Sequence, residues 1–518
     1  MTQTGTARDP SDDAAVTPMA RSSARFRGIS GGVAYLGLRG LRAMLDTRRI
    51  SAVELLEGAV ARIEALDPIV NAVVVRDFER ARVAAIVADA ALARGERGPL
   101  LGVPVTVKEA FSVAGLPTSW GMPAFRNWRP AKDAAAVARL KAAGAIILGK
   151  TNVPFALAEW QTHNAVHGTT RNPWDGARTP GGSSGGAAAA LAAGFVPLEV
   201  GSDLNGSIRI PAHFCGVFGH RPSPGLVPQR GHAPPGAELA AEDSTDGLGV
   251  CGPMARSAED LALGLDVLAG SGRDDEAARS PALPPARHTT LGDFRVLVID
   301  EHPLVRTADA IQSALDRLAG RLAMTGAAVA RASPVLPDLA EAARLHARVT
   351  AAPSLVGRGP EALSRAEVLL ARQPAGDGGL LAERLRGFAL DGRDRSAALA
   401  ARACLRRQWR ALFQAFDVVL CPPACTVAFR HDLSGEREER RIEIDGWDAP
   451  YIDQMAWSSL ATPAGLPATV APAGISEDGL PVGVQIVGPR LEDRTPLAFA
   501  ALLEREFGGF MPPPGFAA

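Results

Sequence analysis

The stretch GSDLNGSIRIP at residues 201–211 decides the interpretation of this chain, because it reads as a turn that leaves a strand and carries Ser207. Earlier in the chain, the run PGGSSGG at residues 180–186 carries Ser183; it is called the first serine run, and residues 201–211 the second. Further upstream, Lys108 follows the apolar stretch VPVTV at residues 103–107. Two serines in glycine-rich turns and a lysine at the end of a strand are what a hydrolase with an amine as its base requires.

Both glycine-containing runs have the composition of turns that expose backbone amides. Residues 180–186 lead into AAAAL at residues 187–191, so Ser183 and Ser184 precede a predicted helix, where unpaired amides favour negative charge. Glycine also lets a substrate approach the main chain. The amides of the second run are suited to hold an oxyanion. Either run alone is equally typical of a structural turn, whereas the two together with Lys108 favour a catalytic site.

Composition limits the class of protein. The chain has 518 residues, of which 47% are hydrophobic and 21% charged, as in compact globular proteins. Its net charge of −1 gives no reason to expect a nucleic acid or an acidic membrane as partner. No apolar stretch approaches the length of a membrane span, and residues 1–33 have the composition of a disordered tail rather than a signal peptide. Five widely spaced cysteines fit a reducing compartment, so a cytoplasmic protein is expected.

Lysine is rare in this chain: only four of the 55 basic residues are lysines. A lysine is therefore informative here, because arginine cannot be deprotonated and lysine can. Lys132 and Lys141 are expected on a solvated helical face. Lys108 and Lys150 each follow an apolar strand, where a charge is costly, so both need a reason.

Strand and helix patterns alternate along the chain, which predicts an α/β layered fold with a mostly parallel or mixed sheet. A helix is expected after Ser51, which forms a capping box with Glu54, and Pro68 is expected to end it. Residues 270–293 read as a surface linker and residues 430–446 as a charged loop. Further helices are expected over 77–95, 133–143, 187–193 and much of 337–412, and strands over 103–107, 145–148, 195–200, 294–299, 416–420 and 482–487.

The ordered motifs resemble those of the amidase signature family. They run from GKTN at 149–152 through TRNPWD at 170–175 and the two serine runs to FCGVFG at 214–219, with weaker similarity at 479–488. The resemblance implies an α/β/α sandwich around a mixed central sheet. It implies one catalytic domain over residues 34–518, divided into N-terminal helices (34–100), a signature core (101–270), a helical cover (337–412) and a C-terminal completion of the core (413–518).

The resemblance also assigns roles to residues. Ser207 is expected to be the nucleophile, Lys108 the ultimate base, and Ser183, held after a cis peptide bond from Gly182, the bridge between them. Backbone amides are expected to form the oxyanion hole, and four residues to support the site. The amides are those of Leu204, Asn205, Gly206 and Ser207, and the supporting residues are Gly182, Ser184, Asp203 and Arg209.

The activity implied is hydrolysis of a carboxylic amide through an acyl-serine intermediate, with related esters and carbamates in chemical reach. No cofactor and no metal are expected, the partner is a small-molecule amide or ester, and a homodimer is left open. The alternative is the ammonia-generating component of a complex that transamidates mischarged glutamyl-tRNA with ammonia from glutamine. A third option is a catalytically silent family member that serves as a binding scaffold.

Two departures from the family pattern concern single residues. Asn205 stands where the family has a glycine, and is expected to keep the loop because asparagine tolerates left-handed backbone geometry. Arg221 stands where the family usually has lysine, at a position that looks structural.

Two pattern matches favour other chemistries. GAIILGKT at 144–151 satisfies the phosphate-loop pattern, although its variable positions are the apolar core of a strand. GGSSG at 181–185 matches the nucleophile elbow, with Asp417 and His431 following in α/β-hydrolase order. However, no strand leads into Gly181.

The aromatic residues that either line a substrate pocket or belong to the core are Trp120, Trp160, Tyr451 and Trp457. The histidines near the motifs, which favour packing or pocket-lining roles, are His163, His167, His213 and His220.

Overall fold

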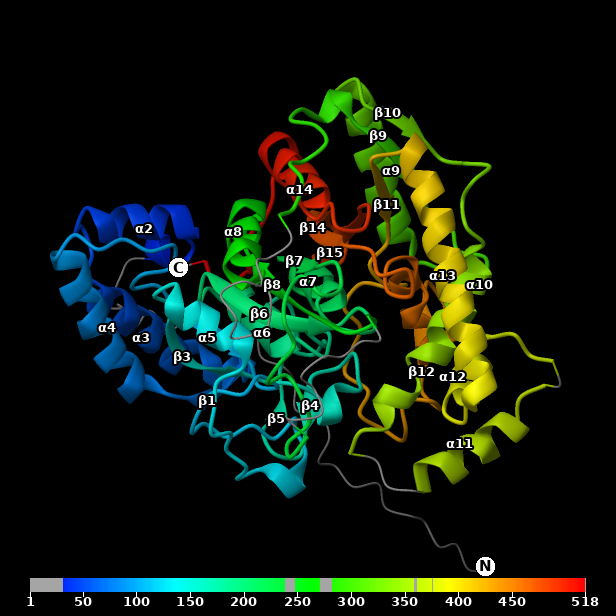
Figure 1. Cartoon of the computed structure of the whole chain (residues 1–518), viewed down its shortest axis with the longest axis horizontal. Coiled ribbons are helices and arrows are strands. Elements are labelled where there is room, and N and C mark those ends of the chain that lie inside the picture. The colour runs from blue at the N-terminus through cyan, green and yellow to red at the C-terminus, as the bar shows by residue number, and fades with distance from the viewer. Residues whose placement is uncertain (1–30, 238–246, 271–281, 358–360, 375, 518) are drawn as a thin grey trace, which may run out of the picture.

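The computed structural model of the chain describes residues 31–237, 247–270, 282–357, 361–374 and 376–517, and Figure 1 shows its architecture. A large mixed sheet runs through the centre of the molecule, with helices packed against it. A single extended hydrophobic cluster links this sheet to the helices around it. The α/β class and the mixed sheet expected from the sequence are confirmed.

The eight strands of the large sheet are ordered β10-β9-β11-β15-β14-β7-β8-β6. Neighbours pair in parallel from β10 to β11 and antiparallel from β11 to β6. In that order the strands are β10 (Ala328–Ala330), β9 (Arg295–Val298), β11 (Val418–Cys421), β15 (Pro481–Val487), β14 (Ala468–Ile475), β7 (Phe218–Arg221), β8 (Val250–Ala255) and β6 (Leu198–Asp203).

A second sheet, of three strands, meets the large sheet at its β6 edge. Its order is β1-β3-β2, with β1 (Val73–Arg76) antiparallel and β2 (Pro104–Lys108) parallel to β3 (Ile146–Thr151). Strand β2 lies beside β6, so the two sheets meet there. Lys108 ends β2 and Asp203 ends β6, which brings the lysine motif next to the second serine run.

The helices fall into three groups. The N-terminal group comprises α1 (Gly31–Ala34), α2 (Leu38–Asp46), α3 (Ala52–Val70), α4 (Phe78–Ala93) and α5 (Ala135–Ala142). The group around the large sheet comprises α6 (Gly185–Ala192), α7 (Arg209–Cys215), α8 (Ala258–Leu268), α9 (Asp309–Met324) and α14 (Arg494–Phe507). The predicted helical cover comprises α10 (Leu339–Val349), α11 (Glu361–Ala371), α12 (Leu380–Gly387) and α13 (Gly392–Ala415), which lie together at the right of Figure 1.

Helix α6 is buried along its whole length, and its composition explains why. A Cβ atom at Gly186 would overlap the backbone of Asn152, so only glycine allows the helix to start this close to β3. The alanines that follow let the helix approach the strands closely. The helix start therefore holds the first serine run deep inside the molecule.

The structure corrects several local expectations. The capping box at Ser51 is present, but helix α3 continues past Pro68 to Val70 and ends where Asn71 adopts a left-handed conformation. The charged loop expected over 430–446 contains β12 (Arg441–Ile444), which pairs with β13 (Trp447–Pro450). Lys132 precedes helix α5 instead of lying on it.

Parts of the expected tail and of the expected linker lie outside the described residues. Residues 1–30 of the tail are not described, whereas its last three residues belong to α1. Residues 271–281 of the expected linker are likewise outside the described part of the chain. Within the part that is described, no helix combines the length and apolarity that crossing a membrane requires.

Candidate active site

Lys108 lies at the centre of a cluster of serine hydroxyls. Its side chain is completely buried, and its Nζ lies 2.7 Å from Ser183 Oγ. It lies 2.9 Å from Ser184 Oγ and 2.9 Å from Ser202 Oγ. The strand end of β2 thus aims an amine at three hydroxyls, two from the first serine run and one from β6.

Burial changes the chemistry of this amine. It lowers the pKa of Lys108 from its ordinary range to about 7, against the opposing influence of Cys251, Asp203 and Glu199. An uncharged amine can accept a proton, so Lys108 is available as a base near neutral pH. Lys150, the other strand lysine, is also buried but donates to Pro117 O (2.7 Å) and Thr118 Oγ1 (2.6 Å), which gives it a structural reason.

The first serine run reaches Lys108 through an unusual backbone. The Gly182–Ser183 peptide bond is cis, as the family resemblance implied. Gly181 has a φ of +85°, and a Cβ at Gly182 would overlap the carbonyl oxygen of Glu159. The Ser184 amide donates to Ser207 O at 3.1 Å, so the two serine runs are hydrogen-bonded to each other.

The second serine run turns tightly between β6 and α7. Gly206 adopts a φ of +83°, and a Cβ there would lie 2.9 Å from the side chain of Ile210. The left-handed residue of this loop is therefore Gly206, whereas Asn205 is not among the residues with positive φ. This corrects the expectation that Asn205 keeps the loop by tolerating left-handed geometry. Trp160 instead holds the Asn205 position, since its Nε1 donates to Asn205 O at 2.8 Å.

The Asp203 carboxylate organises this turn. Its Oδ1 accepts the Gly206 amide and its Oδ2 the Ile208 amide, each at 3.1 Å. The Gly206 amide is thus already occupied, which corrects its expected place among the oxyanion-hole donors. The amides left for that role are those of Leu204, Asn205 and Ser207.

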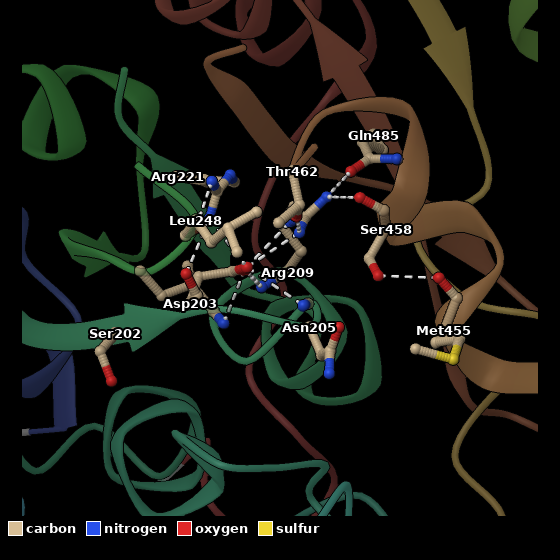
Figure 2. Close-up of polar contacts among 12 residues, drawn as sticks. Ser202, Asp203, Asn205, Arg209, Arg221, Leu248, Met455, Ser458, Thr462 and Gln485 are labelled. Atoms are coloured by element: carbon tan, nitrogen blue, oxygen red, sulfur yellow. Dashed lines mark hydrogen bonds and ion pairs between the residues drawn. The ribbon is translucent and has the colours of Figure 1, made fainter. Parts of the chain in front are cut away.

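Two buried arginines neutralise Asp203, as Figure 2 shows. Arg209 binds it through Nε (3.0 Å to Oδ2) and Nη2 (2.8 Å to Oδ1). Arg221 Nη1 lies 2.7 Å from Asp203 O and 3.4 Å from Oδ1. Burial alone would raise the pKa of Asp203, but the two guanidinium groups hold it below its ordinary value.

The Arg209 guanidinium also ties the loop to the C-terminal part of the chain. Arg209 Nη1 donates to Gln485 Oε1 (2.6 Å) and Ser458 O (3.3 Å), and Nη2 donates to Thr462 Oγ1 (2.9 Å). Figure 2 shows Arg209 between Asp203 on one side and these residues on the other. Asp203 and Arg209 accordingly brace the loop that carries Ser207.

A cavity of about 290 Å³ opens beside the two serines. Ser183 and Ser207 both line it, together with Leu204 and Asn205. Most of the other lining residues are apolar or aromatic, and include Trp120, Leu157, Trp160, His232, Val250 and Val356.

Two of the four aromatic candidates, Trp120 and Trp160, therefore belong to the cavity. The other two serve elsewhere: the Tyr451 hydroxyl donates to Glu159, and Trp457 Nε1 donates to Thr307 Oγ1 at 2.9 Å.

Of the candidate histidines, His213 and His220 are fully buried. His213 Nδ1 accepts the Gly483 amide at 2.7 Å, and His220 Nδ1 lies 2.9 Å from Thr469 Oγ1. Both histidines pack inside the core.

The rival patterns do not assemble into sites in the described structure. The phosphate-loop match ends in β3, whose residues are strand-paired and buried instead of forming a loop with free amides. Asp417 is bound by Arg295, Arg287 and His288, and no hydrogen bond between Asp417 and His431 occurs among the described residues.

Two residues of the site were missed by sequence reasoning. The Ser202 hydroxyl oxygen accepts from Lys108 Nζ, and Glu199 lies buried three positions earlier in β6. For Ser202 the signal was its position two residues after the apolar Val200, which puts both side chains on the same face of the strand. For Glu199 it was a lone carboxylate in a stretch that otherwise reads as a buried strand.

Comparison with known proteins gives a consistent result. The model of the Amidase family matches residues 54–497. The chain is 35% identical over 482 residues to the A component of a glutamyl-tRNA(Gln) amidotransferase from Roseiflexus castenholzii, covering 90% of this chain and 94% of that protein. It is 35% identical over 477 residues to the Putative amidase AmiB2 of Mycobacterium tuberculosis, covering 91% and 96%.

Solved structures include close neighbours in fold. A bacterial aryl acylamidase of the amidase signature enzymes superposes with a TM-score of 0.75 at 25% identity, covering 92% of this chain and 97% of that one. A structure described as an amidase superposes with a TM-score of 0.71 at 30% identity, covering 91% and 99%.

Proposed function

This chain belongs to the amidase family and is a hydrolase of carbon–nitrogen bonds, and we propose that it cleaves carboxylic amides through an acyl-Ser207 intermediate. The observation that carries the proposal is the 2.7 Å contact between the buried amine of Lys108 and Ser183 Oγ, beside a cavity that Ser183 and Ser207 share. A serine hydroxyl is a weak nucleophile until a base removes its proton. The contact of Lys108 with Ser183 supports Lys108 as that base, and the cavity that Ser183 shares with Ser207 supports Ser183 as the relay.

The reaction proceeds in two halves. Uncharged Lys108 takes the proton of Ser183, which takes that of Ser207, while Ser207 Oγ attacks the substrate carbonyl carbon. The amides of Leu204, Asn205 and Ser207 donate to the oxyanion that forms. The C–N bond then breaks as Ser183 returns the proton to the leaving nitrogen, and water hydrolyses the acyl-serine by the same route.

The lining of the cavity favours an uncharged substrate. The charged side chains that reach it are already engaged: Asp203 by two arginines, Glu159 by Arg440 at 2.6 Å, and Arg437 by Glu438 at 2.8 Å. Among the described residues the cavity therefore offers no unengaged charge to a ligand. A neutral amide with apolar or aromatic substituents is the substrate class that this lining suits.

Glutamine is the substrate of the alternative function, to which the name of the Roseiflexus relative points. Free glutamine carries an ammonium and a carboxylate, and both lose their hydration when bound. Without charged partners in the cavity that loss is not compensated. The proposal is therefore a free-standing amidase that acts on small neutral amides, and on related esters.

The test uses the purified full-length chain without partners. We expect it to hydrolyse neutral anilides and the matching esters, to leave glutamine intact, and to lose amide hydrolysis in Ser207→Ala while the fold is retained. Glutaminase activity equal to or above anilide hydrolysis would refute the free-standing hydrolase in favour of a transamidating complex. The molecular mass of the same preparation, measured by size-exclusion chromatography, shows whether the protein is the homodimer that the sequence leaves open.

A further inference from the structure

A second carboxylate is buried near Lys108 without a cation of its own. Glu199 lies in β6, beside β2, and has no exposed surface. Its Oε2 accepts the Val200 amide at 2.9 Å, whereas Oε1 has no hydrogen-bond partner among the described residues. The described ion pairs likewise include no arginine or lysine within contact distance of Glu199. A buried acid in this condition is costly and needs a reason.

The groups around this acid are hydroxyls and the lysine. Thr106 of β2 and Thr151 of β3 turn their hydroxyls toward the Glu199 carboxylate, outside strict hydrogen-bond geometry. Thr106 stands two positions before Lys108 on the same strand, and Thr151 is the register partner of Lys108 in the neighbouring strand. The strand geometry therefore places the carboxylate and the amine in one buried layer.

The other ionisable groups near Lys108 are already neutral or neutralised. Asp203 is paired with Arg209 and Arg221. Burial raises the pKa of the Cys251 thiol to about 12 and lowers the pKa of His232 to about 3, so both are uncharged at neutral pH. Glu199 is the remaining acid of this group, and its charge is uncompensated unless Lys108 carries the proton.

We propose that Glu199 is the charge partner of Lys108 and sets the pH at which Lys108 becomes an uncharged base. The inference rests on the proposed function, in which Lys108 is that base. Among the described residues no hydrogen bond joins Glu199 to the serines, so it acts through Lys108 as a positioning residue. The two buried groups share one proton: moving it from the carboxyl to the amine creates an ion pair, and moving it back leaves both neutral.

The electrostatics agree with this placement. Burial raises the pKa of Glu199 to about 7 and lowers the pKa of Lys108 to about 7, and the charge of each group favours the charged form of the other. Above the pH at which the pair has released its shared proton, Lys108 is an uncharged base, and the Glu199 carboxylate then stabilises Lys108 once it has accepted a proton.

The test is the pH dependence of kcat/KM for a neutral anilide, compared between the wild type and Glu199→Gln. Glutamine keeps the shape but never carries a charge, so protonated Lys108 loses its counterion and its pKa falls. We expect the acid limb to move toward lower pH by about one unit. Glu383→Gln, which alters a buried glutamate of the distant helix α12, is the matched control and should leave the limb in place.

Thr106→Val provides a second reading that does not depend on the Glu199 variant folding. Loss of the Thr106 hydroxyl makes the Glu199 carboxyl harder to ionise. The acid limb of kcat/KM should therefore also move toward lower pH, by a smaller amount than in Glu199→Gln. An acid limb that stays fixed in both variants, with or without a fall in the plateau rate, overturns the inference. The proposed function fails differently, namely if Lys108→Ala keeps wild-type amide hydrolysis.

Discussion

Replacing Asp203 with asparagine tests how the nucleophile loop is held. The substitution keeps the shape and one acceptor oxygen but removes the charge between two guanidinium groups. Arg209 and Arg221 are fully buried, and Asp203 is the one carboxylate within ion-pair distance of them in the described chain. Asp203→Asn therefore leaves two uncompensated positive charges in the core.

The magnitude follows from these contacts. Removing one partner of a buried ion pair costs about 3–5 kcal/mol, because the remaining charge is left without a counterion. The asparagine NH₂ group also faces N–H donors, either those of Arg209 or that of the Ile208 backbone. This mismatch adds about 1 kcal/mol to the loss of stability. We expect the free energy of unfolding to fall by about 4 kcal/mol or more, and amide hydrolysis to be lost because the amides beside Ser207 lose their anchor.

The assay is chemical unfolding at neutral pH, followed by circular dichroism, for the wild type and the variant. Arg221→Lys is the control: it keeps the charge and introduces the residue usual in the family, so it should cost only about 1 kcal/mol for the hydrogen bond lost. If Asp203→Asn unfolds within about 1 kcal/mol of the wild type, the two arginines do not depend on this carboxylate and the reasoning is refuted.

Three further results are expected. Amide hydrolysis by the wild type should fall as the pH drops through about 7, because protonated Lys108 cannot act as a base, and a rate that is flat across this range would contradict that role. Ser202→Ala removes one of the oxygens that contact the amine, so the acid limb should shift to lower pH with the fold unchanged in circular dichroism. Gly206→Ala should lower the melting temperature and the rate together, since a Cβ would meet Ile210 at 2.9 Å in a left-handed conformation, and an unchanged melting temperature would refute that strain.

The sequence predicted the local elements whose signals are short-range. The capping box at Ser51 begins helix α3 as expected, and the apolar stretches near Lys108 and Val200 form strands. The end of α3 was misjudged because Pro68 lies in its last turn, where a proline removes little. Alternation in RIEIDGW at 441–447 with an Asp-Gly turn signalled the β12–β13 hairpin, but the high charge of the segment masked it.

The site itself was less predictable, because its contacts join residues far apart in the chain. Lys108 and Ser202 are 94 positions apart, and only the approach of β2 to β6 brings them together. The occupation of the Gly206 amide depends on the rotamer of Asp203, which no motif encodes. Glu199 is a charge within an apolar stretch that sequence reasoning missed, because its significance depends on which cations surround it in space.

The central claim is that Ser207 carries the acyl group, and reaction with a fluorophosphonate probe followed by mass spectrometry tests it most directly. Trypsin releases Ser183 and Ser207 in one peptide, residues 179–209, so fragment ions between the two serines must locate the label. We expect the label on Ser207, with none in Ser207→Ala. A label on Ser183, or labelling that persists in Ser207→Ala, would contradict the account.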